Sequence, residues 1–456
     1  MSESILSGDL ATPPFITPRR AGERLWRRLA WRRLQGLRQG RITLIDAGGS
    51  QSFGQAAAES PLQATVYVYD PGVYTRLALR GHIGAGEGYM AGEWSCDDLT
   101  TLIRILVLNG DVVNGLERGL ARLALLLFRL GHALRRNSRR GSCANIAAHY
   151  DLGNDFYRLF LDETLMYSCA LFPTADSSLE EAAIAKIERI CRKLQLGPQD
   201  HLLEIGAGWG GFALHAAARY GCRVTTTTIS RQQYELARER VRQAGLTERV
   251  TVLLKDYRQL EGRYDKLVSI EMIEAVGHSY LPTYLRQCSR LLKPDGMLLL
   301  QAITIADQEY ERARRSVDFI QHYIFPGGCL PSTTAITATV SRVTDLRLFH
   351  FEDIGAHYAL TLQHWRGRFL SQLQQVKAQG FTETFIRMWE FYLCYCEGGF
   401  RERSISAVQM LFTKPLCRRE PLLPELLSWA TPGDGTAGTD RQNAGHGGSA
   451  RAGKPA

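Results

Sequence analysis

An apolar strand that runs directly into a glycine-rich turn is the feature that most constrains this chain. Residues 202–211 read LLEIGAGWGG, and the following FALHAAARYG is typical of a helix. Glycine permits a tight turn and lets a ligand approach the backbone at the carboxyl end of a strand. The segment therefore predicts a strand, a turn and a helix, with a ligand bound at the turn.

The sequence around this turn alternates between strand-like and helix-like segments. A helix is predicted over 178–196, where Ser178 begins a Ser-x-x-Glu cap. The segments CRVTTTTIS, RVTVLLKD, YDKLVSIEMI and GMLLLQAITI read as strands, with helices between them. This alternation predicts an α/β fold with a doubly wound, mostly parallel sheet.

The glycine turn alone is compatible with two classes of ligand. Gly206, Gly208 and Gly211 fit the dinucleotide-binding pattern, which expects an acid about 20 residues later for the ribose hydroxyls. The next strand ends in residues 225–229, TTTTI, without a carboxylate. Glu204, just before the first glycine, instead resembles the acid in the first motif of the S-adenosylmethionine-dependent methyltransferases. We therefore expect S-adenosylmethionine at this turn, with a nicotinamide oxidoreductase as the rival.

Two basic amphipathic segments lie in the N-terminal third of a chain whose formal net charge is +9. Residues 19–41 and 116–140 each interleave arginines with leucines at helical spacing. Such helices bind anionic membrane surfaces, or they pack on their own domain with the arginines in solvent, and the pattern leaves both readings open. Residues 65–70 and 75–81 alternate like short strands, which predicts a small mixed, helix-rich N-terminal domain.

These patterns divide the chain into four parts: a disordered tail over 1–18, a lipid- or membrane-docking domain over 19–145, a catalytic domain over 146–420 and a disordered tail over 431–456. No stretch approaches the roughly 20 apolar residues of a spanning helix, and the N-terminus lacks a secretory signal. We expect a cytoplasmic protein, peripherally associated with the inner face of the membrane. The scattered cysteines predict no metal site, no nucleic-acid module is visible, and a homodimer is left open.

Several blocks ahead of and behind the glycine turn occur in one order: HYDLGNDFYRLFLD from His149, MYSCALF from Met166, EMIEAVGHSYLPTYL from Glu271, YIFPGGCLPS from Tyr323, HYALTLQHW from His357 and FYLCYCEGGFRER from Phe391. Together they resemble the cyclopropane-fatty-acyl-phospholipid synthases, including the mycolic acid cyclopropane synthases, over roughly residues 87–414. The resemblance implies a class I methyltransferase-type fold. It also implies methyl(ene) transfer from S-adenosylmethionine to the double bond of an unsaturated phospholipid acyl chain, through a carbocation that closes to a cyclopropane.

The resemblance also assigns residues to the site. It implies that S-adenosylmethionine contacts Tyr167, Ser168, Glu204, Gly206, Gly208, Gly210, Thr228, Ser230, Gln233 and Tyr257. It implies a bound bicarbonate ion as the base, held by Cys169, Glu274, Gln301, Ile303 and Tyr358. Glu274, Tyr358 and Cys169 are thus expected to be catalytic, with Cys396 beside the site rather than acting as a nucleophile.

Two positions depart from the family pattern. Gln301 stands where the family usually has a histidine, and Ala275 follows Glu274 where many members have a histidine. Glutamine donates a hydrogen bond but carries no charge and relays no proton. Ring closure is therefore the step in question, and a relative that makes a methyl-branched or methylene lipid is the leading alternative. A non-catalytic lipid-binding protein is a further rival.

Overall fold

The computed structural model describes residues 14–18, 21–56, 61–110, 112, 152–420 and 422. The expected tail over 431–456, the second basic segment over 116–140, most of the expected tail over 1–18 and the expected domain boundary near residue 145 lie outside the described residues.

The N-terminal part is built on a four-stranded mixed sheet. Its elements are α1 (Ala21–Leu34), β1 (Gly40–Asp46), β2 (Gly49–Gln55), β3 (Gln63–Val68), α2 (Gly72–Met90), β4 (Trp94–Cys96) and α3 (Leu99–Leu108). The strand order is β2-β1-β3-β4, in which β1 pairs parallel with β3 and antiparallel with β2. The mixed character predicted for this region is confirmed.

Two local predictions in this region have different outcomes. The first basic segment does form a helix, α1, which ends at Leu34 before β1 begins. The strand predicted over 75–81 is wrong, because these residues belong to α2. Alternation over so few residues also fits one face of a helix, and α2 continues to Met90 with a kink at Gly81 (φ +58°).

The C-terminal part contains the remaining described elements. Its helices are α7 (Asn154–Arg158), α8 (Leu179–Leu194), α9 (Gly211–Tyr220), α10 (Arg231–Gln243), α11 (Leu281–Arg290), α12 (Asp307–Ala313), α13 (Thr333–Val343), α14 (Gly355–Ser371), α15 (Leu373–Ala378) and α16 (Glu383–Arg401). One-turn helices lie at Tyr257–Gln259, Ile273–Ala275 and His278–Tyr280, and a π-helical turn at Ile320–Ile324. Its strands are β5 (His201–Ile205), β6 (Arg223–Thr228), β7 (Val250–Leu254), β8 (Tyr264–Ile270), β9 (Leu292–Ile305), β10 (Arg347–Asp353) and β11 (Ile405–Thr413).

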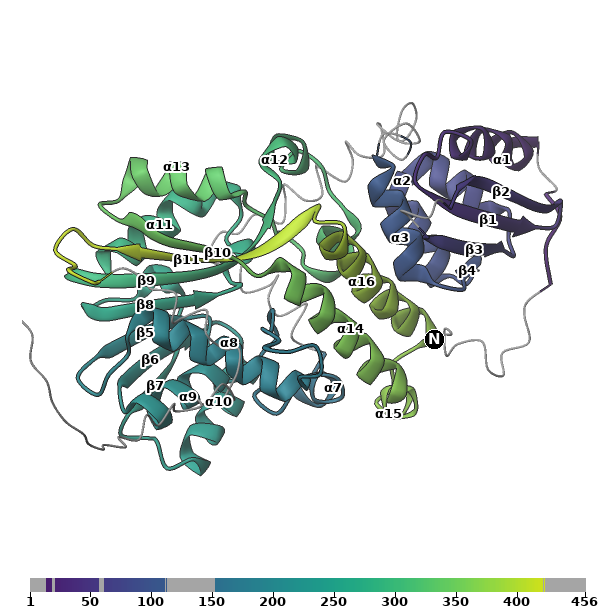
Figure 1. Ribbon diagram of the computed structural model, residues 1–456. Helices are drawn as coiled ribbons and strands as arrows, with labels where there is room; N and C mark the ends of the chain where they lie inside the picture. The colour runs from purple at the N-terminus through teal and green to yellow at the C-terminus, as the bar shows by residue number, and fades with distance from the viewer. Residues whose placement is uncertain are drawn as a thin grey trace, which may run out of the picture. The chain divides into compact units, whose positions relative to one another are not determined.

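These strands form one sheet in the order β10-β11-β9-β8-β5-β6-β7 (Figure 1). The pairs from β7 to β9 are parallel, whereas β11 runs antiparallel to both β9 and β10. The prediction of a doubly wound, mostly parallel α/β sheet is confirmed. Strand order reverses direction at β5, which has β6 on one side and β8 on the other, and ligands bind at the carboxyl edge of such a switch point.

The apolar strands explain why the sheet is stable where the site is built. Leu203, Leu267 and Leu298, on β5, β8 and β9, are 0% exposed. Near-continuous apolar strands are typical of parallel sheets that are covered on both faces. The three central strands therefore form a rigid base for the loops that follow them.

Helices α14 and α16 lie side by side beyond the carboxyl ends of the parallel strands (Figure 1). α16 also contacts α2 and α3, and the Tyr89 hydroxyl on α2 donates to Oε2 of Glu390 on α16 (2.8 Å). Both side chains are buried, with exposures of 4% and 5%. One helix thus links the N-terminal part to the C-terminal part.

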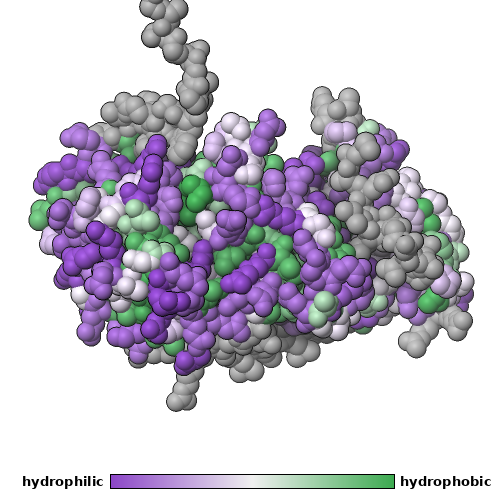
Figure 2. Space-filling view, turned by 90° about the horizontal axis from the view of Figure 1, so that it is seen from below, coloured by the Kyte–Doolittle hydropathy of each residue, from purple (hydrophilic) through white to green (hydrophobic). Residues whose placement is uncertain are grey.

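The surface carries no membrane-spanning feature among the described residues. None of their helices combines the length and the apolar character needed to cross a bilayer. The face seen in Figure 2 is mostly hydrophilic, with hydrophobic patches gathered toward its middle.

Candidate active site

Three glycines shape the turn after β5. The backbone φ is +102° at Gly206, +50° at Gly208 and +85° at Gly210, and a Cβ is strained at such angles. The amides of Gly206 and Ala207 both donate to the carbonyl of Thr227 on β6 (3.0 and 2.8 Å). The turn is thereby fixed at the carboxyl edge of the sheet, where α9 begins.

Glu204 is a buried carboxylate on β5, just before this turn. It is 2% exposed and accepts a hydrogen bond from Oγ1 of Thr226 (2.5 Å). Burial raises its pKa to about 8, against the opposing effects of Thr226 and of the Lys186 ammonium. Burying a carboxylate is costly unless positive charge compensates it, so this position is suited to a cationic ligand.

Polar side chains at the ends of β6 and β7 continue the site. Oγ1 of Thr228 donates to Oε1 of Gln233 (2.8 Å) and accepts from the amide of Ser230 (3.1 Å). Ser230 in turn caps α10 by accepting from the amide of Gln233 (3.3 Å). The Tyr257 ring packs edge-on against Tyr284, with ring centroids 5.3 Å apart. These contacts fix the side chains on one wall of a cavity.

The segment between α7 and α8 forms a second wall. The hydroxyls of Tyr167 and of Tyr392 on α16 are 2.8 Å apart. Oγ of Ser168 accepts a hydrogen bond from Nζ of Lys186 on α8 (2.8 Å). Lys186 is 0% exposed, and burial lowers its pKa to about 8. A buried cation therefore lies next to this wall.

Glu271 directly follows β8 and is the most highly coordinated carboxylate of the site. The amide of Cys169 and Nε2 of Gln301 both donate to its Oε1 (2.9 and 2.8 Å). The Tyr358 hydroxyl donates to its Oε2 (2.6 Å). Burial raises the pKa of Glu271, while these three hydrogen bonds and the charge of Lys186 oppose the rise. Its backbone lies at φ +50°, unusual for a residue with a side chain.

Glu274 lies one turn further along, with far fewer donors. The amide of Ile303 donates to its Oε1, and its buried Oε2 has no hydrogen-bond partner among the described residues. Burial, followed by repulsion from Glu271, raises the pKa of Glu274 to about 8. Two neighbouring carboxylates in unequal surroundings separate into an ionised and a protonated group. At neutral pH the donors favour charge on Glu271 and a proton on Glu274.

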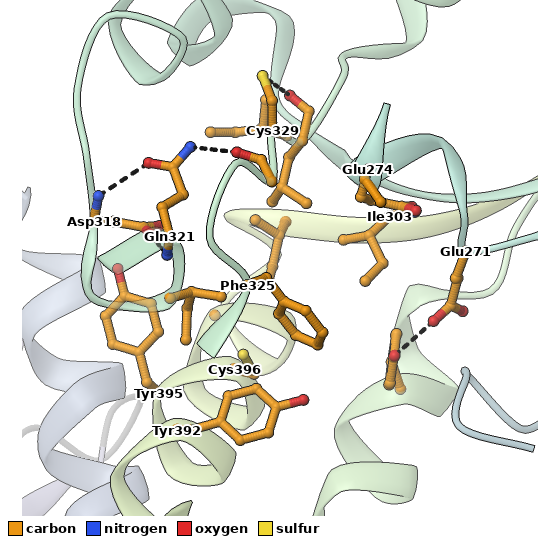
Figure 3. A pocket seen from close by; sticks show the side chains of 18 of the residues that line it. Glu271, Glu274, Ile303, Asp318, Gln321, Phe325, Cys329, Tyr392, Tyr395 and Cys396 are labelled. Carbon is orange, nitrogen blue, oxygen red and sulfur yellow. Dashed lines mark hydrogen bonds between the residues drawn. The ribbon is translucent and has the colours of Figure 1, made fainter. Parts of the chain in front are cut away.

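These groups face one cavity of about 1070 Å³. Figure 3 shows Glu271, Glu274 and Ile303 on one side of it, and Phe325, Tyr392 and Cys396 on the other. Its lining is mainly aliphatic and aromatic near α16, where it includes Phe325, Tyr358, Leu362, Phe391, Tyr392, Tyr395 and Phe400. Aromatic faces stabilise cations without reacting with them. The cavity therefore joins the glycine turn after β5 to an apolar chamber with carboxylates in its wall.

The two cysteines expected at the site take different places. The Cys169 thiol is 0% exposed and donates to the carbonyl of Ala170 (3.2 Å), while its backbone amide faces Glu271. Cys396 lines the chamber, and burial raises the pKa of its thiol far above the ordinary value. Neither thiol is poised as a thiolate nucleophile.

The structure brings the predicted residues together around this cavity. Those that line it are Tyr167, Ser168, Glu204, Gly206, Gly208, Thr228, Gln233, Tyr257, Glu274, Ile303, Tyr358 and Cys396. Four others are not among its lining residues: Gly210 directly precedes α9, Ser230 caps α10, and Cys169 and Gln301 donate to Glu271.

Glu271 is the residue that the sequence reasoning missed. It comes directly after the strand ending at Ile270, and the carboxyl end of a parallel strand is where site residues gather. Its position at the end of β8 could have indicated a site residue, but the family resemblance assigned this role to Glu274, three residues later.

Comparisons with known proteins identify the family of the chain. The sequence profile of the family described as "Mycolic acid cyclopropane synthetase" matches residues 137–410. The chain is 41% identical over 360 residues to the tuberculostearic acid methyltransferase UfaA1 of Mycobacterium tuberculosis, which covers 77% of this chain and 84% of that protein. It is 38% identical over 354 residues to the cyclopropane-fatty-acyl-phospholipid synthase of Escherichia coli K12, which covers 77% and 88%.

Solved structures show the same relationship for the catalytic part. The cyclopropane synthase MmaA2 of Mycobacterium tuberculosis superimposes with a TM-score of 0.56 at 32% identity, over 60% of this chain and 98% of that one. The mycolic acid cyclopropane synthase CmaA1, solved with SAH and CTAB, gives a TM-score of 0.56 at 33% identity over the same shares. The predicted class I methyltransferase-type fold is confirmed. The chain belongs to the mycolic acid cyclopropane synthetase family and is an S-adenosylmethionine-dependent methyltransferase.

Proposed function

We propose that the protein transfers the methyl group of S-adenosylmethionine to the double bond of an unsaturated fatty-acyl chain in a phospholipid and closes the product to a cyclopropane. The observation that carries this proposal is the single cavity, in which the glycine turn and Glu204 open into an aromatic chamber beside Glu271 and Glu274. An alkene is a weak nucleophile, so donor and acceptor must be held close together without water.

The residues at the strand ends fit the donor. The glycine turn leaves room for it to approach the backbone, and Glu204 offers a carboxylate to its positively charged amino acid end. Thr228, Gln233 and Tyr257 supply hydroxyl, amide and ring surface at the ends of the next two strands. When bound, the donor supplies an electrophilic methyl group on a sulfonium centre.

The residues around Glu271 do not fit a bicarbonate ion. The amide of Cys169, the side-chain amide of Gln301 and the Tyr358 hydroxyl already donate to Glu271, and the Ile303 amide donates to Glu274. An added anion would find these donors taken and two carboxylates beside it, and burying an unpaired charge is costly. Bicarbonate therefore takes no part in the reaction that we propose.

The test is product analysis with purified protein, S-adenosylmethionine carrying a labelled methyl group, and vesicles of a monounsaturated phospholipid. We expect label in the acyl chain and a mass gain of one CH2 unit. Absence of label from acyl carbon would refute the proposal. Mild hydrogenation then separates the outcomes, because a methylene lipid takes up hydrogen under conditions that leave a cyclopropane intact.

A methyl-branched or methylene lipid is the second candidate. It is favoured by the relative named as a tuberculostearic acid methyltransferase, and by Gln301 in place of the usual histidine. Methyl transfer is common to both candidates. A methylene lipid or an unsaturated methyl-branched lipid differs from the cyclopropane only in which proton the cation loses, so the hydrogenation step decides between them. A saturated methyl branch would also require a reductant, which this assay does not contain.

The pKa of Glu204 gives a first prediction. Its ionised form pairs with the ligand's ammonium group, and in the free protein its pKa is about 8. We therefore expect the affinity for S-adenosylhomocysteine to rise up to about tenfold per pH unit below pH 8, and to level off above it. Calorimetric titration from pH 6 to 8.5 measures this dependence.

The matched variant is Glu204→Gln, which keeps the shape but cannot ionise. We expect its affinity to be roughly 10- to 100-fold lower at pH 8, and to vary little with pH. A wild-type protein whose affinity is flat across this range would contradict the pairing.

Peripheral attachment to a membrane surface is also proposed, and α1 supports it. Leu25 and Leu29 are 54% and 41% exposed, one turn apart, with Arg24, Arg28 and Arg32 exposed beside them. The other side of the helix is anchored, because Arg27 pairs with Asp46. An apolar strip flanked by arginines suits an interface with anionic head groups.

Replacing both exposed leucines tests this attachment. We expect Leu25→Ser with Leu29→Ser to weaken binding to anionic phospholipid vesicles about tenfold, as measured by cosedimentation. The matched control is Leu348→Ser on β10, a leucine that is 44% exposed. Equal losses in both variants, or none in the first, would exclude α1 as the docking helix.

A further inference from the structure

The Glu271 carboxylate accepts hydrogen bonds from three separate parts of the fold. Its donors are the amide of Cys169, Nε2 of Gln301 on β9 and the hydroxyl of Tyr358 on α14. The Glu271 amide also donates to the carbonyl of Gln301 (2.8 Å), so backbone and side chain are both anchored to β9. A carboxylate with several donors is stabilised in its ionised form even when buried.

The orientation of Gln301 is fixed by a chain of donors that begins at a lysine. Nζ of Lys193 can only donate, and it donates to Oε1 of Gln409 on β11 (2.8 Å). Nε2 of Gln409 is then left to donate to Oε1 of Gln301 (3.0 Å). Gln301 must therefore present its NH2 group to Glu271. A glutamine at position 301 is thus suited to donate a hydrogen bond to the carboxylate of Glu271.

Charge balance favours the same arrangement. The buried Lys186 ammonium lies close enough to act electrostatically on both Glu271 and Cys169. Among the described lining residues near Glu271, the second carboxylate, Glu274, has only the Ile303 amide as a donor. Lys186 also acts on the buried carboxylates of Glu204 and Asp162, so its positive charge is already shared, and a further free anion beside Glu271 would lack a compensating charge.

We propose that Glu271 is itself the general base of the reaction and stands in the chain where a bound bicarbonate ion would otherwise act. This inference rests on the proposed function. As the carbon–sulfur bond of the donor breaks, the alkene forms a bond to the methyl carbon and becomes a carbocation. A C–H bond of the new methyl group then breaks. Its electron pair closes the ring, and its proton passes to the Glu271 carboxylate.

Two substitutions separate this base from a bicarbonate. Glu271→Gln keeps the volume but removes the carboxylate. Glu271→Gly empties the site, leaves the three donors free and suits a backbone at φ +50°. Each protein is assayed for labelled acyl product in buffer stripped of carbon dioxide, and again with added bicarbonate.

We expect the wild type to be equally active in both buffers. Glu271→Gln should lose about 100-fold or more in both, as expected for removal of a general base. Glu271→Gly should lose as much in stripped buffer and regain at least tenfold with bicarbonate. A wild type that needs bicarbonate, or a Glu271→Gln variant within twofold of wild type, would overturn the proposal.

A binding measurement decides the same point without turnover. We expect 13C-labelled bicarbonate to bind saturably to Glu271→Gly, and not to the wild type, in an NMR titration. Saturable binding to the wild-type site would overturn the proposal. If the wild type labels no acyl chain, the proposed function fails, and this titration still reports whether Glu271 occupies the anion site.

Two controls test whether the Glu271 variants lose activity through misfolding or through the loss of one negative charge anywhere on the protein. Glu239→Gln makes the same chemical change at an exposed carboxylate on α10 that pairs with Arg242. It should keep wild-type activity. Thermal unfolding and calorimetric titration with S-adenosylhomocysteine show whether the Glu271 variants remain folded with the donor site intact.

Discussion

Replacing Glu274 with glutamine is expected to slow turnover about 100-fold while making the protein more stable at neutral pH. The loss of rate follows because about half of the molecules already carry an ionised Glu274 at pH 8, near its pKa of about 8, and this carboxylate stabilises positive charge developing on the acyl chain in a medium of low dielectric. Glutamine offers only a dipole at the same place. The measurement is kcat with unsaturated phospholipid vesicles.

The gain in stability follows from the pKa of the same group. Glu274 has a pKa of about 8 in the folded protein, against an ordinary value of 4.5. Between these pH values the unfolded chain ionises this group while the folded protein keeps it protonated, so the free energy of unfolding falls as pH rises. Glu274→Gln removes this loss. We expect no difference from wild type near pH 4 and a gain of about 4 kcal/mol at pH 8.

Denaturant unfolding of both proteins at pH 4, 6 and 8 measures the difference. A constant difference across this range would show that Glu274 does not titrate as described. If kcat were unchanged while stability rose as expected, Glu274 would be a buried, protonated carboxyl group that takes no part in the reaction.

Valine at Gly206 is expected to abolish measurable binding of S-adenosylhomocysteine, a loss of at least about 100-fold. The backbone there lies at φ +102°, and an added Cβ would come within 3.3 Å of Met272. Strain of this kind costs about 1–3 kcal/mol. The branched side chain would also occupy the turn that the donor approaches. Calorimetric titration measures the affinity, and thermal unfolding measures the strain.

Gly245→Val supplies the matched control. Gly245 lies at φ +67° after α10 with open space around it, so valine is strained there without meeting a neighbour. We expect a comparable loss of stability with unchanged affinity for S-adenosylhomocysteine. If Gly206→Val bound the ligand as tightly as Gly245→Val does, the turn after β5 would not be the donor site.

The central βα unit and the parallel sheet could be predicted because their signals are local. An apolar run, a glycine turn and an amphipathic helix lie within a few residues of one another. The strand predicted over 75–81 failed for the same reason, since so short an alternation does not separate a strand from α2.

The surroundings of Glu271 could not be predicted in this way. Its donors Cys169, Gln301 and Tyr358 lie 102, 30 and 87 positions away in the sequence. At Cys169 the group that acts is the backbone amide, which every residue except proline possesses. Residue identity therefore indicated which residues lie at the site, but not that they donate hydrogen bonds to Glu271.

The position of α16 has a consequence for dissecting this protein. This one helix carries Glu390, which accepts a hydrogen bond from Tyr89 on α2 of the N-terminal part, and Tyr392 and Cys396, which line the apolar chamber. A fragment cut free of the first hundred residues would lose that hydroxyl and leave an orphaned carboxylate one half-turn from the chamber wall. The proposed surface attachment through the N-terminal part and the proposed chemistry would both depend on α16, so the two parts are best studied in one intact chain.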